Sequence, residues 1–361
     1  MSNYKSSRTS AYVRHLCSLG LPDATVMPEI VEGLRSIVDA DSGSFFWAGE
    51  DFDIAAVYAQ KEAVYKTYPA YAALRANGHV RKLQGDFTDW MKGGRYVANT
   101  AHIDREFVNS AFYSEVVRPC HCRHVIVSIV DDGRRGWGAL MMTREESQTP
   151  FSDADWATLE GFKTHVMHAL RPPLKAIHDW TDSNNSATTL VDWNGRILHC
   201  SPSFSRLLRF ARDETLGPSP STLPPLLMPL LKRLQHLHKG EPAAEARLDT
   251  QNRWGLFLWR GYPLEAGPTI SSPGFIIYGQ HQQPRLLTAA RGAHQLGLSA
   301  QQQLVSLHWA KGRTQREIAQ DLRVKESTVI DHLRRVYERL DVRDSTALAE
   351  RLIVAGSAAL N

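Results

Sequence analysis

The sequence predicts a multidomain α+β protein in which two mixed domains of helix and strand precede an all-helical C-terminal domain. Its 361 residues are enough for about two or three domains. Two turn signals, Asp131-Asp132-Gly133 and Asn194-Gly195, each separate a pair of apolar, strand-like runs. After residue 297, apolar side chains recur only at helical spacing. We therefore expect domains at residues 1–178, 179–285 and 297–361, with a linker at 286–296.

Bulk composition sets few limits on function. The net charge is +4 and the pI is near 8.8, which permits nucleic-acid binding without arguing for it. Four cysteines are too few for a disulfide scaffold and fit a reducing compartment. The N-terminus lacks the apolar core of a signal peptide, and no run approaches the roughly 18 apolar residues that span a bilayer. We expect a cytoplasmic protein without a membrane partner.

The first domain is predicted from helical and strand-like patterns in turn. Residues 1–10 are polar, and helical patterning begins near Ala11. Further elements follow in order: a helix at 27–40, a strand at 42–49, a Tyr-rich and mostly helical stretch at 51–83, a hairpin of strands at 122–132 and 135–145, and a long closing helix at 151–173. Ser152 is the expected N-cap of that closing helix.

The second domain is expected to be one small sheet with two helices. It begins after a polar stretch at 181–186, and two short strands surround Asn194-Gly195. A helix follows at 201–211, and a Pro-rich stretch leads into another helix that ends near Gly240. Strand-like segments at 245–251, 254–264 and 274–282 complete the domain.

The C-terminal domain carries strong signals for helix starts and stops. Ser299 can cap a first helix, and Gly312 is placed to end it in a left-handed turn. Thr314 and Glu317 have the spacing of a capping box, in which each side chain bonds the other's backbone N–H. A second helix then covers 316–322 and ends in a tight turn.

A third helix is expected from about Glu326 to Leu340, and a fourth from Asp344 or Ser345. One apolar stripe runs along the third helix, formed by Val329, Leu333, Val336 and Leu340. Two short helices joined by a tight turn, the second longer and basic, have the geometry that places a helix in the DNA major groove. The alternative is a small helical bundle whose charged face is only solvated.

The segment LSAQQQLVSLHWAKGRTQREIAQDLRVKESTVIDHLRRVYERLDV, residues 298–342, closely resembles the LuxR-type helix-turn-helix of bacterial regulators. The matching positions are Gly312, Glu317-Ile318-Ala319, Leu322, Val324, Thr328-Val329, His332-Leu333, Tyr337, Leu340 and Val342. The resemblance implies a domain of four helices. It also implies that the third helix enters the major groove and that the fourth helps to form a dimer on half-sites with two-fold symmetry.

Some positions depart from the LuxR-type pattern. Leu304 stands where the family usually has an acidic residue, and Lys325 where it usually has a capping Ser. Ile330 and Asp331 replace residues that are commonly basic or amide-bearing. Ile330 could pack on a thymine methyl group, and Asp331 could accept a hydrogen bond from a cytosine amino group. The alternative for Asp331 is a charge that only favours the helix dipole.

We predict a set of DNA-contacting residues on the second and third helices: Thr314, Gln315, Arg316, Lys325, Ser327, Thr328, Ile330, Asp331, Arg334 and Arg335. Arg334 or Arg335 is the candidate that reads a guanine or anchors a phosphate. From Leu298 onward, ten Lys or Arg residues face eight Asp or Glu residues. With so little excess charge, a monomer should bind DNA weakly, and dimerisation should decide the affinity.

The two N-terminal domains resemble sensory folds. Val125–Val130, Gly136–Met142 and the helix opened by Phe151-Ser152-Asp153 make the first domain similar to a GAF-like domain. Val191–Ile197 and the following Ser-Pro-Ser-Phe helix start make the second similar to a PAS domain, although that family usually has Asn near Ser201. These resemblances imply two α/β sensory domains ahead of a DNA-binding domain.

Aromatic residues of the first domain either line an apolar ligand pocket or simply fill the core: Trp47, Tyr58, Tyr65, Tyr68, Tyr71 and Trp90. Of these, Trp47, Tyr58, Tyr65 and Trp90 are our candidate ligand-binding residues. Cys120, Cys122 and His124 alternate along an expected strand, so their side chains would share one face. They could bind a soft metal or sense oxidation. The alternative is an ordinary strand, and we assign no metal or cofactor.

The leading hypothesis is a dimeric transcription regulator that binds double-stranded DNA and responds to a small-molecule or protein signal, with RNA polymerase as a further candidate partner. Its alternatives are a phosphorelay output, an acyl-lactone receptor of the quorum-sensing kind, and a protein that acts through protein contacts. An enzyme is not expected, because the sequence has no phosphate-binding Gly-rich loop, metal-carboxylate set or nucleophile elbow. The C-terminal segment also distantly resembles the promoter-binding end of sigma factors, but the sequence lacks the other regions of those proteins.

Overall fold

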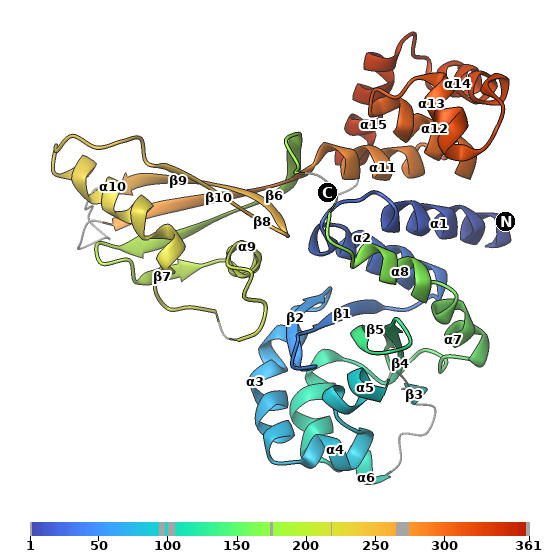
Figure 1. Cartoon of the computed structure of the whole chain (residues 1–361). Coiled ribbons are helices and arrows are strands. Elements are labelled where there is room, and N and C mark those ends of the chain that lie inside the picture. The colour runs from blue at the N-terminus through green and yellow to red at the C-terminus, as the bar shows by residue number, and fades with distance from the viewer. Residues whose placement is uncertain are drawn as a thin grey trace. The chain divides into compact units, whose positions relative to one another are not determined.

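The computed structural model describes residues 2–93, 98–99, 105–173, 176–217, 219–264 and 274–358 (Figure 1). The chain divides into two compact units. The first unit comprises Met1–Ala176, Thr215–Pro218 and Ala289–Gly356, and the second comprises Ile177–Glu214, Ser219–Thr288 and Ser357–Asn361. In the described part of the chain, every helix is too short or too polar to cross a bilayer.

The first unit contains a five-stranded antiparallel sheet in the order β2-β1-β5-β4-β3. Its strands are β1 (Ser42–Ala48), β2 (Ile54–Ala59), β3 (Ala98–Asn99), β4 (His124–Asp131) and β5 (Gly136–Arg144). The expected hairpin is present, with β4 paired to β5 and Gly133 at a φ of +82° in the turn. Phe45 and Phe46 show the alternation of the sheet, because the first is fully buried and the second lines a cavity on the opposite face.

Helices cover both faces of this sheet (Figure 1). Packed against one face are α2 (Asp23–Ile37), α7 (Asp153–Glu160) and α8 (Lys163–Ala169), and α1 (Ser2–Cys17) packs on α2 and α8. The other side carries α3 (Glu62–Ala76), α4 (His79–Gln84), α5 (Phe87–Gly93) and α6 (Arg105–Val108), followed by a π-helical turn (Tyr113–Val117) and a 3-10 turn (Arg118–Cys120).

Two local predictions in this unit were wrong, and that of a mostly helical stretch at 51–83 was incomplete. The stretch at 51–83 opens with strand β2, whose backbone pairs with β1. Its two consecutive alanines favour a helix locally, and the long-range pairing overrides that preference. The closing helix is two helices, because the chain turns at Gly161 and Phe162 before α8 begins. Helix α1 begins at Ser2 rather than near Ala11. The Ser152 cap is confirmed: its hydroxyl accepts the Asp155 N–H.

The second unit contains a five-stranded antiparallel sheet in the order β7-β6-β10-β9-β8. Its strands are β6 (Trp180–Asp192), β7 (Ile197–Cys200), β8 (Arg247–Asn252), β9 (Gly255–Leu264) and β10 (Gly274–Pro284), and its helices are α9 (Pro202–Ala211) and α10 (Met228–His238). The hairpin at Asn194-Gly195 is confirmed, with Gly195 at a φ of +83°. The polar stretch at 181–186, expected to precede the domain, belongs to β6 because it pairs with β10.

The C-terminal segment is helical throughout its described part. Its helices are α11 (Arg285–Gln295), α12 (Ala300–Ala310), α13 (Gln315–Leu322), α14 (Glu326–Leu340) and α15 (Ser345–Ala358). The stretch at 286–296, expected as a linker, is therefore mostly helix α11. Within the first unit, α11 approaches the backbone of α15 closely: a Cβ at Gly292 would lie 1.9 Å from the Leu352 carbonyl oxygen. Only glycine fits at this position.

Candidate DNA-binding site and cavity of the first unit

The expected caps define the starts of α12 and α13. Ser299 and Gln302 form a capping box at the start of α12. At the start of α13, the Thr314 hydroxyl accepts the Glu317 N–H at 3.3 Å, and the Glu317 carboxylate accepts the Thr314 N–H at 2.8 Å. Arg323 ends α13 in the left-handed conformation, at a φ of +52°. These local bonds fix the helix-turn-helix.

A small apolar core joins the three helices. Five side chains are buried together in it: Val305, Ile318, Ala319, Val329 and Leu333. Trp309 packs against this core, and its indole N–H donates to the Tyr337 hydroxyl at 2.8 Å. The apolar stripe of α14 is thus turned inward, and the opposite side of that helix faces solvent.

The outer side of α14 carries most of the predicted DNA-contacting residues. Ser327, Ile330, Arg334 and Arg335 are exposed, and the Asp331 carboxylate is about half exposed. Lys325 is the N-cap of α14 but makes no capping hydrogen bond through its side chain. The remaining predicted residues lie at the start of α13 or on the edge of α14: Thr314, Gln315, Arg316 and Thr328. The Thr314 side chain caps its helix, so it has a structural role in addition.

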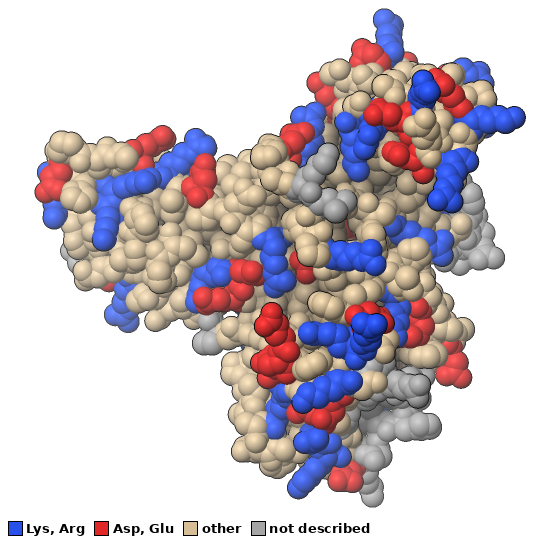
Figure 2. Space-filling view, viewed as in Figure 1, with Lys and Arg blue, Asp and Glu red and all other residues tan. Residues whose placement is uncertain are grey.

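Asp331 forms ion pairs with both arginines of this face. Its two carboxylate oxygens lie 2.9 Å from Arg334 Nη2 and 3.0 Å from Arg335 Nη2. Arg334 also lies 3.5 Å from the Glu338 carboxylate. The Arg334 hydrogen bond and the Arg335 charge hold the pKa of Asp331 below its usual range. Figure 2 shows the result, with acidic and basic side chains interspersed over the C-terminal helices.

Asp331→Asn should therefore raise the affinity for DNA of random sequence. The substitution releases two guanidinium groups and removes a charge that repels phosphate. We expect the slope of log K against log salt concentration to steepen by about 1 for each additional phosphate contact. The measurement is a salt titration of binding to a mixed-sequence duplex. Glu350→Gln, the same charge change on α15, is the matched control, and an unchanged slope in Asp331→Asn would contradict the assignment.

The geometry of α12 to α14 defines a helix-turn-helix of the kind that binds DNA. Residues 296–352 match the family model of the bacterial regulatory proteins of the luxR family. This segment is thus similar to the DNA-binding domain of a family of transcription regulators, which is not a family of enzymes.

Solved structures give weaker likenesses. Escherichia coli SdiA is 12% identical, with 91% of this chain and 89% of that chain covered and a TM-score of 0.28. A phage VqmA–DPO complex is 16% identical, with 48% and 85% covered and a TM-score of 0.21. The VqmA dimer of Vibrio cholerae without target DNA is 13% identical, with 47% and 82% covered and a TM-score of 0.17. These scores are too low to support a function. None of the curated proteins matches the chain.

A buried ion pair connects the N-terminal and C-terminal segments of the first unit. Arg291 on α11 lies 2.6 Å from the Glu29 carboxylate on α2, and their side chains are 6% and 16% exposed. Glu29 also accepts a hydrogen bond from the Tyr12 hydroxyl at 3.0 Å, and Arg291 donates to the Gly356 carbonyl at 3.0 Å. Sequence reasoning missed this set, because nothing local pairs residues so far apart along the chain.

Two buried histidines lie where α1 packs on the C-terminal helices. The His294 ring stacks on Tyr12, with the ring centroids 4.4 Å apart, and its carbonyl accepts a hydrogen bond from Arg8. His15 lies on α1, which packs on α12. Burial lowers the pKa of each histidine to about 4. For His15, nearby His308 and Arg14 lower the pKa further, while Gln303 opposes them.

Mild acid should weaken this contact. Because an unfolded histidine has a pKa near 6.5, the unfolded chain takes up these protons first as the pH falls. The stability that the neutral rings contribute is therefore complete above about pH 6.5 and is lost between about pH 6.5 and 4. Thermal unfolding at pH 7.5, 6 and 5 checks this. The His15→Gln/His294→Gln variant should lose less stability over that range, and an equal loss would contradict the assignment.

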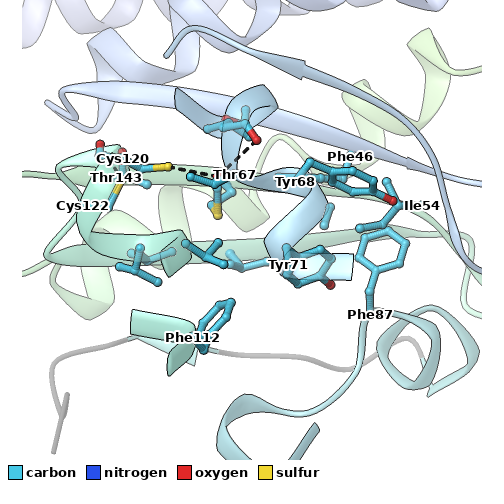
Figure 3. A pocket seen from close by; sticks show the side chains of 18 of the residues that line it. Phe46, Ile54, Thr67, Tyr68, Tyr71, Phe87, Phe112, Cys120, Cys122 and Thr143 are labelled. Atoms are coloured by element: carbon cyan, nitrogen blue, oxygen red, sulfur yellow. Dashed lines mark hydrogen bonds between the residues drawn. The ribbon is translucent and has the colours of Figure 1, made fainter. Parts of the chain in front are cut away.

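A cavity of about 160 Å³ lies in the N-terminal part of the first unit (Figure 3). Trp90 lines it, but the other predicted ligand residues do not: Trp47, Tyr58 and Tyr65. Trp47 instead donates its indole N–H to Asp23 at 2.6 Å, and the Tyr65 hydroxyl bonds the backbone of Ala59. The four predicted ligand residues therefore do not form one site.

The expected strand of Cys120, Cys122 and His124 is also absent. Cys120 ends a 3-10 turn, His121 follows with a φ of +50°, and β4 begins only at His124. No group of three or more His, Cys, Asp or Glu side chains in the described residues is arranged to hold a metal ion. Both thiols line the cavity, and burial raises the pKa of each, so they stay protonated at neutral pH.

Proposed function

We propose that this chain is a transcription regulator that binds double-stranded DNA in a sequence-specific way through residues 297–361. The observation that carries this proposal is the outer face of α14, which is polar, solvent-facing and held by the buried core of the helix-turn-helix. Such a helix can enter the major groove. Ile330 is 46% exposed there, as an apolar contact to a thymine methyl group would require.

We propose in addition that the regulator acts as a homodimer. The DNA-binding domain has ten basic residues against eight acidic ones from Leu298 onward, so two copies are needed for a useful number of phosphate contacts. Helix α15 offers an apolar contact, because Val354 is 62% exposed. Two copies would bind half-sites of two-fold symmetry about one helical turn apart. RNA polymerase is a further candidate partner once the dimer is on DNA.

The N-terminal domains, GAF-like and PAS-like in this proposal, receive the signal. The ion pair between Glu29 and Arg291 supports this coupling, because it ties the start of the DNA-binding segment to α2. The chain then has two arrangements, one with this contact formed and one with it broken. A signal molecule shifts the balance between them only as far as its affinities for the two differ.

The test is binding of the purified full chain to fragments of genomic DNA at near-physiological salt, followed by sequencing of the bound fragments. We expect a short enriched palindrome whose half-site spacing gives the dimer geometry. Binding that is sensitive to salt but blind to sequence would refute the specific-regulator proposal and leave a protein-contact role for the helix-turn-helix. If the full chain binds nothing, the Arg291→Met variant, which releases the contact with α2, should bind. Failure of both, with thermal unfolding showing that the variant is folded, refutes DNA binding.

A further inference from the structure

The cavity in the first unit lies between one face of the sheet and one face of helix α3. Alternate residues of β1 and β5 face it, namely Ser42, Ser44 and Phe46, and Ala139, Met141 and Thr143. Helix α3 contributes residues spaced by one helical turn: Val64, Thr67, Tyr68 and Tyr71. Because strand and helix each direct a full face toward this space, the cavity belongs to the fold and is not a surface irregularity.

The side chains that line the cavity are uncharged. No Asp, Glu, Lys, Arg or His is among the described residues that line the cavity. A carboxylate, phosphate or ammonium group placed there would lose its water without gaining an opposite charge, which is strongly unfavourable. A ligand that enters this space is therefore uncharged.

The volume limits the size of the ligand. The cavity measures about 160 Å³. In an engineered protein, an apolar cavity of about 150 Å³ stays dry and binds benzene. The space here thus suits a molecule about as large as one ring with a small substituent. A long acyl chain would need the cavity to enlarge.

The polar groups of the cavity differ between its two ends (Figure 3). At one end, Thr67 lies 3.7 Å from the Cys120 thiol, and its hydroxyl donates to the Ala63 carbonyl at 3.0 Å. The polar groups of Thr67 and Cys120 at this end are therefore already hydrogen-bonded within the protein. At the other end, near Ile54 and Phe87, the rings of Tyr68 and Tyr71 line the space.

The two tyrosines are suited to hydrogen bonding with a ligand. No hydrogen bond connects the hydroxyl of Tyr68 or Tyr71 to another described residue. Burial raises the pKa of both hydroxyls, so they remain protonated at neutral pH. Both rings line the cavity, so each protonated hydroxyl is a donor available to a ligand acceptor that lies beside it.

We infer that this cavity binds an uncharged molecule of about single-ring size, held by aromatic and aliphatic side chains and by a hydrogen bond from Tyr68 or Tyr71 to an acceptor on the ligand. The inference rests on the proposed function in one respect, that a small molecule is the signal at the N-terminal domain. It adds the chemical class of that molecule and the site that takes it.

Binding of four probes to the full chain tests the inference. Acetophenone is neutral, has one ring and carries a hydrogen-bond acceptor; ethylbenzene lacks the acceptor, benzoate is charged, and N-dodecanoyl homoserine lactone is long. Calorimetry and quenching of tryptophan fluorescence measure the affinities. We expect acetophenone to bind most tightly, ethylbenzene about threefold to tenfold more weakly, and benzoate at least about tenfold more weakly. The long lactone should not compete.

Two variants locate the binding. Tyr71→Phe should weaken acetophenone about threefold to tenfold and leave ethylbenzene unchanged. Tyr262→Phe makes the same change at an exposed tyrosine of the second unit and is the control. Ala139→Leu fills the cavity and should abolish the binding of both neutral probes, with thermal unfolding as the check that the variant is folded.

Each of the following outcomes would overturn the inference. Equal affinity for benzoate would mean that the lining does not exclude charge, and tight binding of the lactone alone would mean that the site opens to a long chain. Unchanged acetophenone binding in both Tyr71→Phe and Ala139→Leu would place the ligand elsewhere. None of these results affects the enrichment of a DNA palindrome, so a failure here is distinct from a failure of the proposed DNA binding.

Discussion

Replacing Arg291 with methionine should lower the free energy of unfolding by about 3–5 kcal/mol. The guanidinium is 6% exposed and is the ion-pair partner of the Glu29 carboxylate, which is 16% exposed. In the described part of the chain, its removal leaves a buried carboxylate whose remaining hydrogen bond comes from the Tyr12 hydroxyl. The cost comes from this uncompensated charge rather than from the lost attraction. Denaturant unfolding measures the effect.

The double variant Glu29→Gln/Arg291→Met separates the two causes. With both charges gone, most of the stability should return, because the pair itself contributes little beyond its own desolvation cost. Arg316→Met, the same change at an exposed arginine of α13, should have little effect. If the double variant is as unstable as Arg291→Met, the unpaired carboxylate is not the cause. Arg291→Met should also make α11 more sensitive to proteolysis, since its tie to α2 is lost.

Replacing Arg334 with alanine should weaken binding to the selected DNA sequence by roughly tenfold to a hundredfold, if this side chain reads a base. Arg334 is on the exposed face of α14, and a base contact requires its guanidinium to exchange the Asp331 carboxylate for the base. The loss should be much smaller on mixed-sequence DNA. Titrations on both duplexes at one salt concentration measure the ratio.

A phosphate contact would give a different result. The loss would then be equal on both duplexes, and the slope of log K against log salt would flatten by about 1. Arg351→Ala on α15 is the matched control, because it removes the same charge from the same domain. No loss on either duplex would remove Arg334 from the DNA-binding site and leave Arg335 as the candidate.

The DNA-binding domain was predictable because its signals are local. The capping box of Thr314 and Glu317 spans three residues, and the stripe from Val329 to Leu340 lies on a single helix. The hairpins at Gly133 and Gly195 are equally local, since the turn residues alone set the backbone. Such features can be recognised from residues a few positions apart, without knowledge of the rest of the fold.

The cavity of the first unit was predictable only in outline. Aromatic residues in this region suggested a pocket, but of the four that we selected only Trp90 lines it. Tyr68 and Tyr71 lie on the face of α3 that the sheet covers, and Trp47 lies on the opposite face of β1. Which face of an element is covered depends on how the sheet is assembled, and the spacing of the aromatics does not contain that information.

By itself, the sequence determined the helix-turn-helix, its caps and the two hairpins, because hydrogen bonds and side-chain spacing within a few residues define them. Only the tertiary structure decided that residues 54–59 form a strand, that 286–295 form a helix and that Glu29 pairs with Arg291 across 262 residues. In each of these cases the stabilising partner is distant in the chain. In the strand, backbone pairing with β1 outweighs the local preference for helix.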